Sequence, residues 1–262
     1  MDASTPVGQW ISDLVYLSGD GIACFAYLFV GVRLYRLSRR TGQLPEFLIA
    51  ACFLLWVLSY AFYDITYAIV ASEELVPAVC SYGSLVTLVL GNVAFALFIR
   101  SVFRPDARWA TWLVAAIAVS NFAGLAGMGW IGDWEGINPL SNSWYWMEFF
   151  GSFAPSSWMG AEGLAQYSKA RRRLKLGLCE PMACNRFLLW AIAGALWVIL
   201  EGILTANDVV NALTGEWSEL LGFGVALFEV FPVTIIWFVF FPPAFYCRWV
   251  EGSGKPADAA LK

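Results

Sequence analysis

Long apolar runs separated by short polar segments dominate this chain. A helix that crosses a membrane needs about 20 consecutive apolar residues, and runs of that length recur along the sequence. The pattern predicts one membrane domain, residues 1–251, with seven spans near residues 11–34, 46–71, 76–100, 109–131, 144–168, 186–207 and 218–246. Residues 252–262 have no such run and are predicted to form a disordered tail. The expected fold class is an all-α membrane protein with seven transmembrane helices.

The composition agrees with a membrane domain. Hydrophobic residues make up 60% of the chain and charged residues only 14%, whereas a soluble domain has about 25% charged residues. Aromatic residues reach 17%, with 14 tryptophans, as expected of a protein with aromatic belts at both membrane interfaces. The first apolar run is too long for a signal peptide and ends in arginines, so no cleavable signal is expected.

Loop charges predict the orientation. Basic residues follow the first, third and fifth spans: Arg33, Arg36, Arg39, Arg40, Arg100, Arg104, Arg108, Lys169, Arg171, Arg172, Arg173 and Lys175. Acidic residues follow the second, fourth and sixth: Glu73, Glu74, Asp133, Glu135, Asp208 and Glu216. Because cytoplasmic loops are enriched in Lys and Arg, the N-terminus is predicted outside and the C-terminus in the cytoplasm. We expect the basic loops to contact anionic lipid headgroups and not nucleic acid.

Acidic side chains lie inside the apolar spans with no basic residue at the same depth: Asp20, Asp64, Glu148, Glu201 and Glu229. A charge at the bilayer centre costs about 2.5–3.5 kcal/mol by insertion scales, so each acid must be protonated, face water or hold a cation. At about 1.5 Å per residue, four of them reach a similar depth in the outer half of the bilayer, and Glu148 lies nearer the outer rim. The pattern predicts an outward-facing acidic site.

Helical neighbours of these acids add further candidate ligands. Tyr60 and Tyr67 share a helix face with Asp64, so their phenols can hydrogen-bond its carboxyl. Asn92 lies beside a stripe of small residues in the third span and completes the candidate site. A similar stripe in the sixth span comprises Trp197, Glu201 and Thr205.

The small-residue stripe of the fifth span and the prolines of the fifth and seventh spans each have two interpretations. Small residues recur every fourth position after Glu148, at Ser152, Ser156 and Gly160, which fits either helix packing or a polar pathway. Pro155 and Pro232 lie within about two turns of Glu148 and Glu229. Each proline either interrupts its helix and frees a carbonyl for a cation or makes an ordinary packing kink.

The segment Arg39–Glu46, with the pattern R-R-T-x-x-L-P-E, resembles a loop in bacterial seven-helix membrane proteins of uncharacterised activity. The resemblance implies a multi-pass protein of the bacterial inner membrane. In topology the chain is also similar to rhodopsins and G-protein-coupled receptors. All four lysines lie outside the predicted spans, so no retinal Schiff base and no cofactor are expected. The absence of histidine excludes seven-helix hydrolases with histidine-bound zinc.

Three functions remain open. The first is a secondary transporter or ion-conducting protein whose acids bind protons or a small cation. The second is a non-catalytic sensor or partner subunit that binds an apolar ligand, or a membrane or cytoplasmic protein. The third, a lipid enzyme, is the weakest, because no nucleophile and base are paired and no metal motif occurs. The sequence favours the transporter and predicts no enzymatic activity.

Overall fold

The computed structural model describes residues 6–69, 75–131, 139–215 and 219–253, which are entirely helical apart from short connections. Eight helices follow one another along this part of the chain: α1 (Pro6–Thr41), α2 (Leu44–Ile69), α3 (Leu75–Phe103), α4 (Arg108–Ile131), α5 (Ser143–Lys175), α6 (Pro181–Thr214), α7 (Glu219–Phe240) and α8 (Ala244–Ser253). The predicted all-α class is confirmed.

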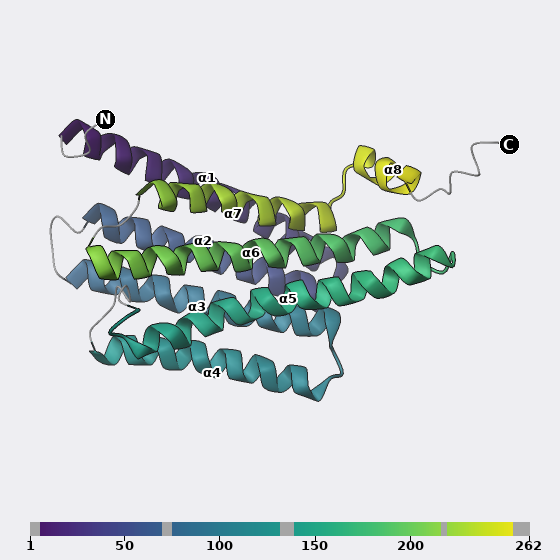
Figure 1. The fold of residues 1–262 in the computed structure, drawn as a ribbon, viewed down its shortest axis with the longest axis horizontal. Coiled ribbons are helices and arrows are strands. Elements are labelled where there is room, and N and C mark those ends of the chain that lie inside the picture. Colours follow the sequence, from purple (N-terminus) through teal and green to yellow (C-terminus); the bar gives the residue numbers. More distant parts are fainter. Residues whose placement is uncertain (1–5, 70–74, 132–138, 216–218, 254–262) are drawn as a thin grey trace.

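The long helices run side by side (Figure 1), and the contacts between them join six into a closed ring. Helices that follow one another in the chain pack side by side in the pairs α1–α2, α2–α3, α5–α6 and α6–α7, and the contacts α1–α7 and α3–α5 close the ring. Helix α4 lies outside it, against α3 and α5, and α8 packs on α6. Short connections favour such neighbours; between α1 and α2 the chain turns at Gly42, whose φ of 69° suits glycine.

Within the described residues, five helices are long and apolar enough to cross a membrane: α1 from Gly21, α2 to Tyr63, α3 from Val79, α4 and α6. Helices α7 and α8 pass the same test as a bent pair and raise the number to six. Large apolar side chains also point away from the bundle, such as Trp112, which is 76% exposed, and Phe25, which is 69% exposed. The chain is a multi-pass membrane protein.

The predicted last span, residues 218–246, is broken near its C-terminal end. Helix α7 ends at Phe240, and α8 starts at Ala244 with an axis bent by 79°. Pro242 and Pro243 lie between them, and proline cannot donate the backbone hydrogen bonds that would continue the helix. Helix α8 includes Gly252 and Ser253, so the start of the predicted tail is helical; residues 254–262 lie outside the described part.

Neither internal proline interrupts its helix. Pro155 lies within the continuous helix α5 and Pro232 within the continuous helix α7. The interpretation that these prolines break their helices beside an acid is therefore wrong. The discontinuity of the last span lies at residues 241–243, far from Glu229 along the helix.

Large aromatic side chains fill the centre of the ring. These side chains come from α1, α2, α3 and α6: Tyr27, Phe53, Trp56, Phe95 and Trp197. Most of their contacts are edge to face, with ring centroids 5.3 Å apart for Phe95 and Trp197 and 5.7 Å apart for Trp56 and Trp197, while Phe53 and Trp56 are stacked. Such contacts add to the stabilisation from burial. We call these five residues the aromatic cluster.

Candidate functional site

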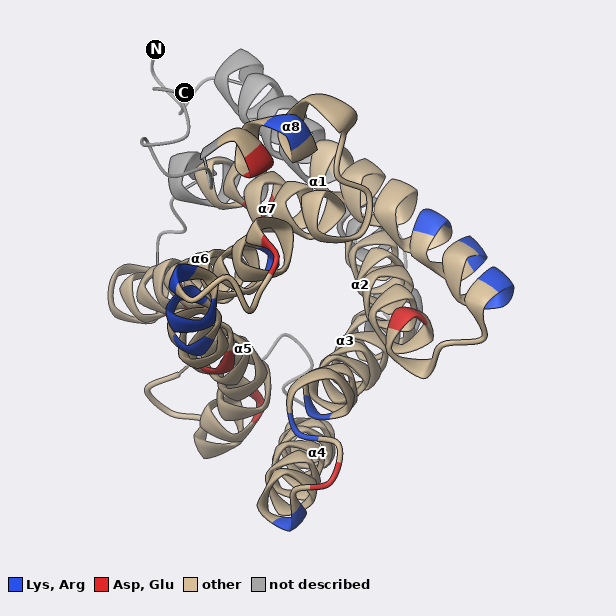
Figure 2. Cartoon of the chain, turned by 90° about the vertical axis from the view of Figure 1, so that its right-hand side faces the viewer, with Lys and Arg blue, Asp and Glu red and all other residues tan. Residues whose placement is uncertain are grey.

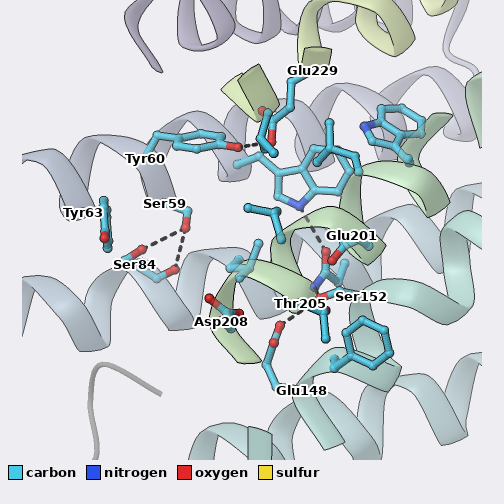
Figure 3. Close-up of a pocket in the computed structure, with 18 of the residues that line it drawn as sticks. Ser59, Tyr60, Tyr63, Ser84, Glu148, Ser152, Glu201, Thr205, Asp208 and Glu229 are labelled. Atoms are coloured by element: carbon cyan, nitrogen blue, oxygen red, sulfur yellow. Dashed lines mark hydrogen bonds between the residues drawn. The ribbon is translucent and has the colours of Figure 1, made fainter. Parts of the chain in front are cut away.

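A cavity of about 340 Å³ lies next to the aromatic cluster, inside the ring (Figure 3). Every ring helix contributes to its wall, and the lining residues are Tyr27, Trp56, Ser59, Tyr60, Tyr63, Ser84, Leu88, Asn92, Tyr145, Glu148, Phe149, Ser152, Trp197, Leu200, Glu201, Leu204, Thr205, Asp208, Val225 and Glu229. Most come from the C-terminal halves of α2 and α6 and the N-terminal halves of α3, α5 and α7, and the others lie near the middle of their helices: Tyr27 of α1, Trp56, Asn92 and Trp197. The cavity therefore occupies one half of the bundle.

Basic residues gather at the opposite end of the bundle, which we call the basic end (Figure 2). Three segments end there: the C-terminus of α1, the α3–α4 connection and the C-terminus of α5. They carry Arg39, Arg40, Arg104, Arg108, Arg172, Arg173 and Lys175. In contrast, no described lysine or arginine lines the cavity, whose wall includes four carboxyl groups. The described lysines and arginines thus lie away from the cavity.

Three of the four carboxyls accept a hydrogen bond from a neutral hydroxyl on another residue. The Tyr60 hydroxyl donates to Oε1 of Glu229 at 2.5 Å, from α2 to α7. The Tyr145 hydroxyl donates to Oδ2 of Asp208 at 2.6 Å, from α5 to α6. Ser152 donates to Oε1 of Glu148 at 2.8 Å within α5. Hydroxyl donors stabilise a carboxyl group without neutralising its charge.

Glu201 differs from the other three acids. Its carboxyl is partly exposed in the cavity and forms no hydrogen bond with any side chain or backbone group in the described part of the chain. Trp197 and Thr205 lie one turn away on either side of it and also line the cavity, as the predicted stripe on this helix requires. Glu201 is therefore a carboxyl that a bound ligand can reach.

Asn92 links the carboxyl groups to the aromatic cluster. Its amide nitrogen donates to Oγ of Ser152 at 2.8 Å and to Oδ1 of Asn121 at 3.4 Å, and its Oδ1 accepts from the indole of Trp56 at 3.2 Å. Asn121 comes close because Gly151 has no side chain: a Cβ there would lie 2.2 Å from the Asn121 amide nitrogen. The bond between Asn92 and Asn121 joins α3 to α4, as polar side chains in membrane helices commonly do.

The structure brings five of the eight predicted site residues to one cavity: Tyr60, Asn92, Glu148, Glu201 and Glu229. The side chains of Asp20, Asp64 and Tyr67 lie outside the described residues. Tyr60 donates a hydrogen bond across the ring to Glu229. Its expected bond to the neighbouring Asp64 involves a side chain outside the described part of the chain.

Asp208 was predicted to lie in an outer loop, and this prediction is wrong. Helix α6 continues to Thr214 and ends at Gly215, whose φ of 73° is left-handed, as is common after a helix C-terminus. Asp208 therefore faces the cavity together with Glu201 and Thr205. The spacing of four and then three residues among these side chains was a signal for one helix face.

The small-residue stripe on α5 lines the cavity at one end and packs against α6 at the other. Glu148 and Ser152 line the cavity. Further along, Gly160 packs against α6 so closely that a Cβ on Gly194 would lie 2.4 Å from the Gly160 backbone nitrogen. The stripe is polar at the cavity and allows helix packing nearer the basic end.

A fifth acid, Glu162, is bonded in a different way. It lies on α5, only 6% exposed, and Oε1 accepts a hydrogen bond of 2.7 Å from Nε of Arg104 in the α3–α4 connection. The hydrogen bond and the charge of Glu162 raise the pKa of Arg104 above its usual range. The Arg104 guanidinium also lies over the ring of Trp109 at 5.7 Å.

Among the residues described, no three His, Cys, Asp or Glu side chains are grouped so that they could hold one metal ion. The carboxyls are instead spread around a space large enough for a small molecule. Comparisons with protein-family models, curated proteins and solved structures found no match. The chemistry of the cavity alone therefore has to carry a functional proposal.

Proposed function

We propose that this multi-pass membrane protein is a secondary transporter or ion-conducting protein that binds protons or a cation in the cavity. The observation that supports this most strongly is the charge of the cavity wall: four carboxyls, with no lysine or arginine among the lining residues. Acids inside membrane helices that face an interior cavity commonly mark ion and substrate pathways. A proton or a cation would balance the charge that the described wall leaves uncompensated.

The proposal includes seven membrane-crossing helices, with the N-terminus outside and the basic end in the cytoplasm. Helix α7 has 22 residues, about 33 Å at the usual rise, and packs between α1 and α6. Helix α5 is too polar to pass the hydropathy criterion, but it packs between α4 and α6, which do pass. The basic end supports this orientation in a bacterial inner membrane by the positive-inside rule. The cavity then lies in the outer half.

Flux measurements test the proposal. Wild-type protein in liposomes should carry protons or a test cation in response to an imposed gradient, and Glu201→Gln and Glu229→Gln should reduce this flux strongly at equal protein insertion. Asp106→Asn is the matched control, because Asp106 is an exposed acid at the basic end and does not line the cavity. Protein that inserts normally but moves no proton or cation would contradict the proposal.

The alternative function is a sensor or partner subunit that binds a ligand without moving it. The aromatic residues of the cavity wall favour it, because cavities lined by aromatic and a few polar groups are typical of ligand sites. Saturable ligand binding in the absence of any flux would favour the sensor over the transporter.

A further inference from the structure

The size of the cavity restricts what it binds. At about 340 Å³ it has room for roughly ten water molecules, since each occupies about 30 Å³ in the liquid. This volume falls at the lower end of the range for small-molecule sites, about 300–1,000 Å³. A proton or a dehydrated metal ion would fill only a small part of it. The volume favours a ligand with a carbon skeleton of several atoms.

Aromatic rings form one part of the cavity wall. Trp56 and Trp197 both line it, and the indole N–H of each is already bonded, to Asn92 at 3.2 Å and to the hydroxyl of Tyr27 at 3.3 Å. These two side chains therefore offer the cavity aromatic carbon and π electrons, and not hydrogen-bond donors. Such a surface attracts alkyl groups through burial and cations through the ring quadrupole.

A carboxyl lies directly beside this aromatic surface. Glu201 is one helical turn from Trp197 on the same face of α6 and forms no hydrogen bond within the described residues. The nearby carboxyls of Glu148, Asp208 and Glu229 are occupied by Ser152, Tyr145 and Tyr60. Glu201 is thus the acid with both oxygens open to a donor, and a charged N–H donor forms the strongest bond to a carboxylate.

We propose that the cavity binds a small organic ammonium ion, whose N–H groups donate to Glu201 and whose alkyl part packs on Trp56 and Trp197. This deepens the proposed function and rests on it, because it names the cation that the site takes. The positive charge comes from the ligand, since no lysine or arginine lines the cavity in the described residues. A neutral molecule of the same shape would not balance the charge of the carboxyl groups in the cavity wall.

Calorimetry on the full chain in nanodiscs of neutral lipid tests the assignment. The probe is n-butylammonium, and 1-butanol and sodium are the matched neutral and inorganic comparisons. Butylammonium should bind saturably at pH 7 and the comparisons much more weakly. Glu201→Gln should weaken butylammonium binding roughly 10- to 100-fold, the effect of losing a charge-assisted hydrogen bond. Trp197→Phe, which keeps an aromatic ring, should weaken it less, and Asp106→Asn should leave it unchanged.

Several results would overturn the assignment. Equal binding of butanol and butylammonium would show that charge is not recognised, and unchanged affinity in Glu201→Gln would exclude the proposed contact. Glu201-dependent flux of protons or sodium without ammonium binding would overturn the ammonium assignment and leave the proposed function standing. Well-folded wild-type protein that neither binds butylammonium nor carries any cation would overturn the ammonium assignment and the proposed function together.

Discussion

Helices α5 and α6 pack together along their length, but their two halves differ. Near the aromatic cluster and beyond it, Glu148 and Glu201 face a cavity of about 340 Å³. Towards the basic end the backbones touch: a Cβ on Gly194 would lie 2.4 Å from the Gly160 nitrogen, and one on Gly163 would lie 2.5 Å from the Ala191 nitrogen. One helix pair thus has a closed half that fixes its geometry and an open half that leaves room for a ligand.

The buried acids of the two halves differ in the charge of their hydrogen-bond partners. Glu229 and Glu162 are similarly buried, at 5% and 6% exposure. Glu229 accepts a hydrogen bond from the neutral phenol of Tyr60, whereas Glu162 is paired with the charged guanidinium of Arg104. A guanidinium supplies a positive charge beside a buried carboxylate, whereas a phenol donates a hydrogen bond and supplies no charge. The charge of Glu162 is thus compensated by Arg104, whereas no lysine or arginine among the described residues lines the cavity that Glu229 faces.

The largest expected effect comes from inserting a methyl group where α5 and α6 touch in the closed half. In Gly194→Ala the new methyl would meet the Gly160 backbone at 2.4 and 2.6 Å, and backbone cannot move aside as a flexible side chain can. Overpacking of this kind costs about 1–3 kcal/mol, occasionally more. We expect a fall of several degrees in the thermal unfolding midpoint of the purified protein in detergent.

The control for this prediction is Gly202→Ala on the same helix, where a Cβ would meet nothing within 4 Å. That variant should be neutral or slightly more stable, because alanine favours helix over glycine by up to about 1 kcal/mol. Equal midpoints for the two variants would mean that the close approach of α5 and α6 does not stabilise the bundle.

The periodicity of the chain predicted much of this arrangement, and the exceptions have physical causes. Glu201 and Thr205 were placed on one face because helical spacing is local information. The bond from Tyr60 to Glu229 was not predictable, since it depends on which helices meet across the ring. For the same reason no local pattern connects Arg104 with Glu162, which are 58 residues apart.

Helix ends were the other source of error. Asp208 was excluded from the sixth span because polar residues were taken to mark the membrane boundary, but α6 continues to Thr214. Hydropathy predicts where lipid begins and not where helical hydrogen bonding stops. Pro242 and Pro243 show the opposite case, in which apolar residues continue across the break between α7 and α8.

The next largest effect tests the ion pair of the closed half. Arg104→Met would leave the Glu162 carboxylate buried without its charged partner, and its other oxygen, Oε2, has no hydrogen bond in the described part of the protein. Removing one partner of a fully buried pair costs about 3–5 kcal/mol. Because the Arg104 side chain is 35% exposed, solvent screening reduces the expected loss to about 1–3 kcal/mol.

A double variant separates the pair from other contacts of Arg104, such as its packing over Trp109. Adding Glu162→Gln to Arg104→Met should restore part of the lost stability, because the orphaned charge is gone. The coupling follows from the thermal unfolding midpoints of the wild type, both single variants and the double variant. Additive losses would contradict the ion pair as the source of the effect.

The smallest expected change in stability concerns the open half, where Glu201→Gln should leave the unfolding midpoint unchanged or raise it by an amount equivalent to about 0–1 kcal/mol. Glu201 has no hydrogen bond to lose within the described residues, and the amide removes a carboxyl from a wall that already holds three others. Glu162→Gln is the opposite case, because it takes the charge away from Arg104 and should lower the midpoint. A clear destabilisation by Glu201→Gln in ligand-free protein would mean that Glu201 supports the bundle, and the division into a closed structural half and an open functional half would fail at its central residue.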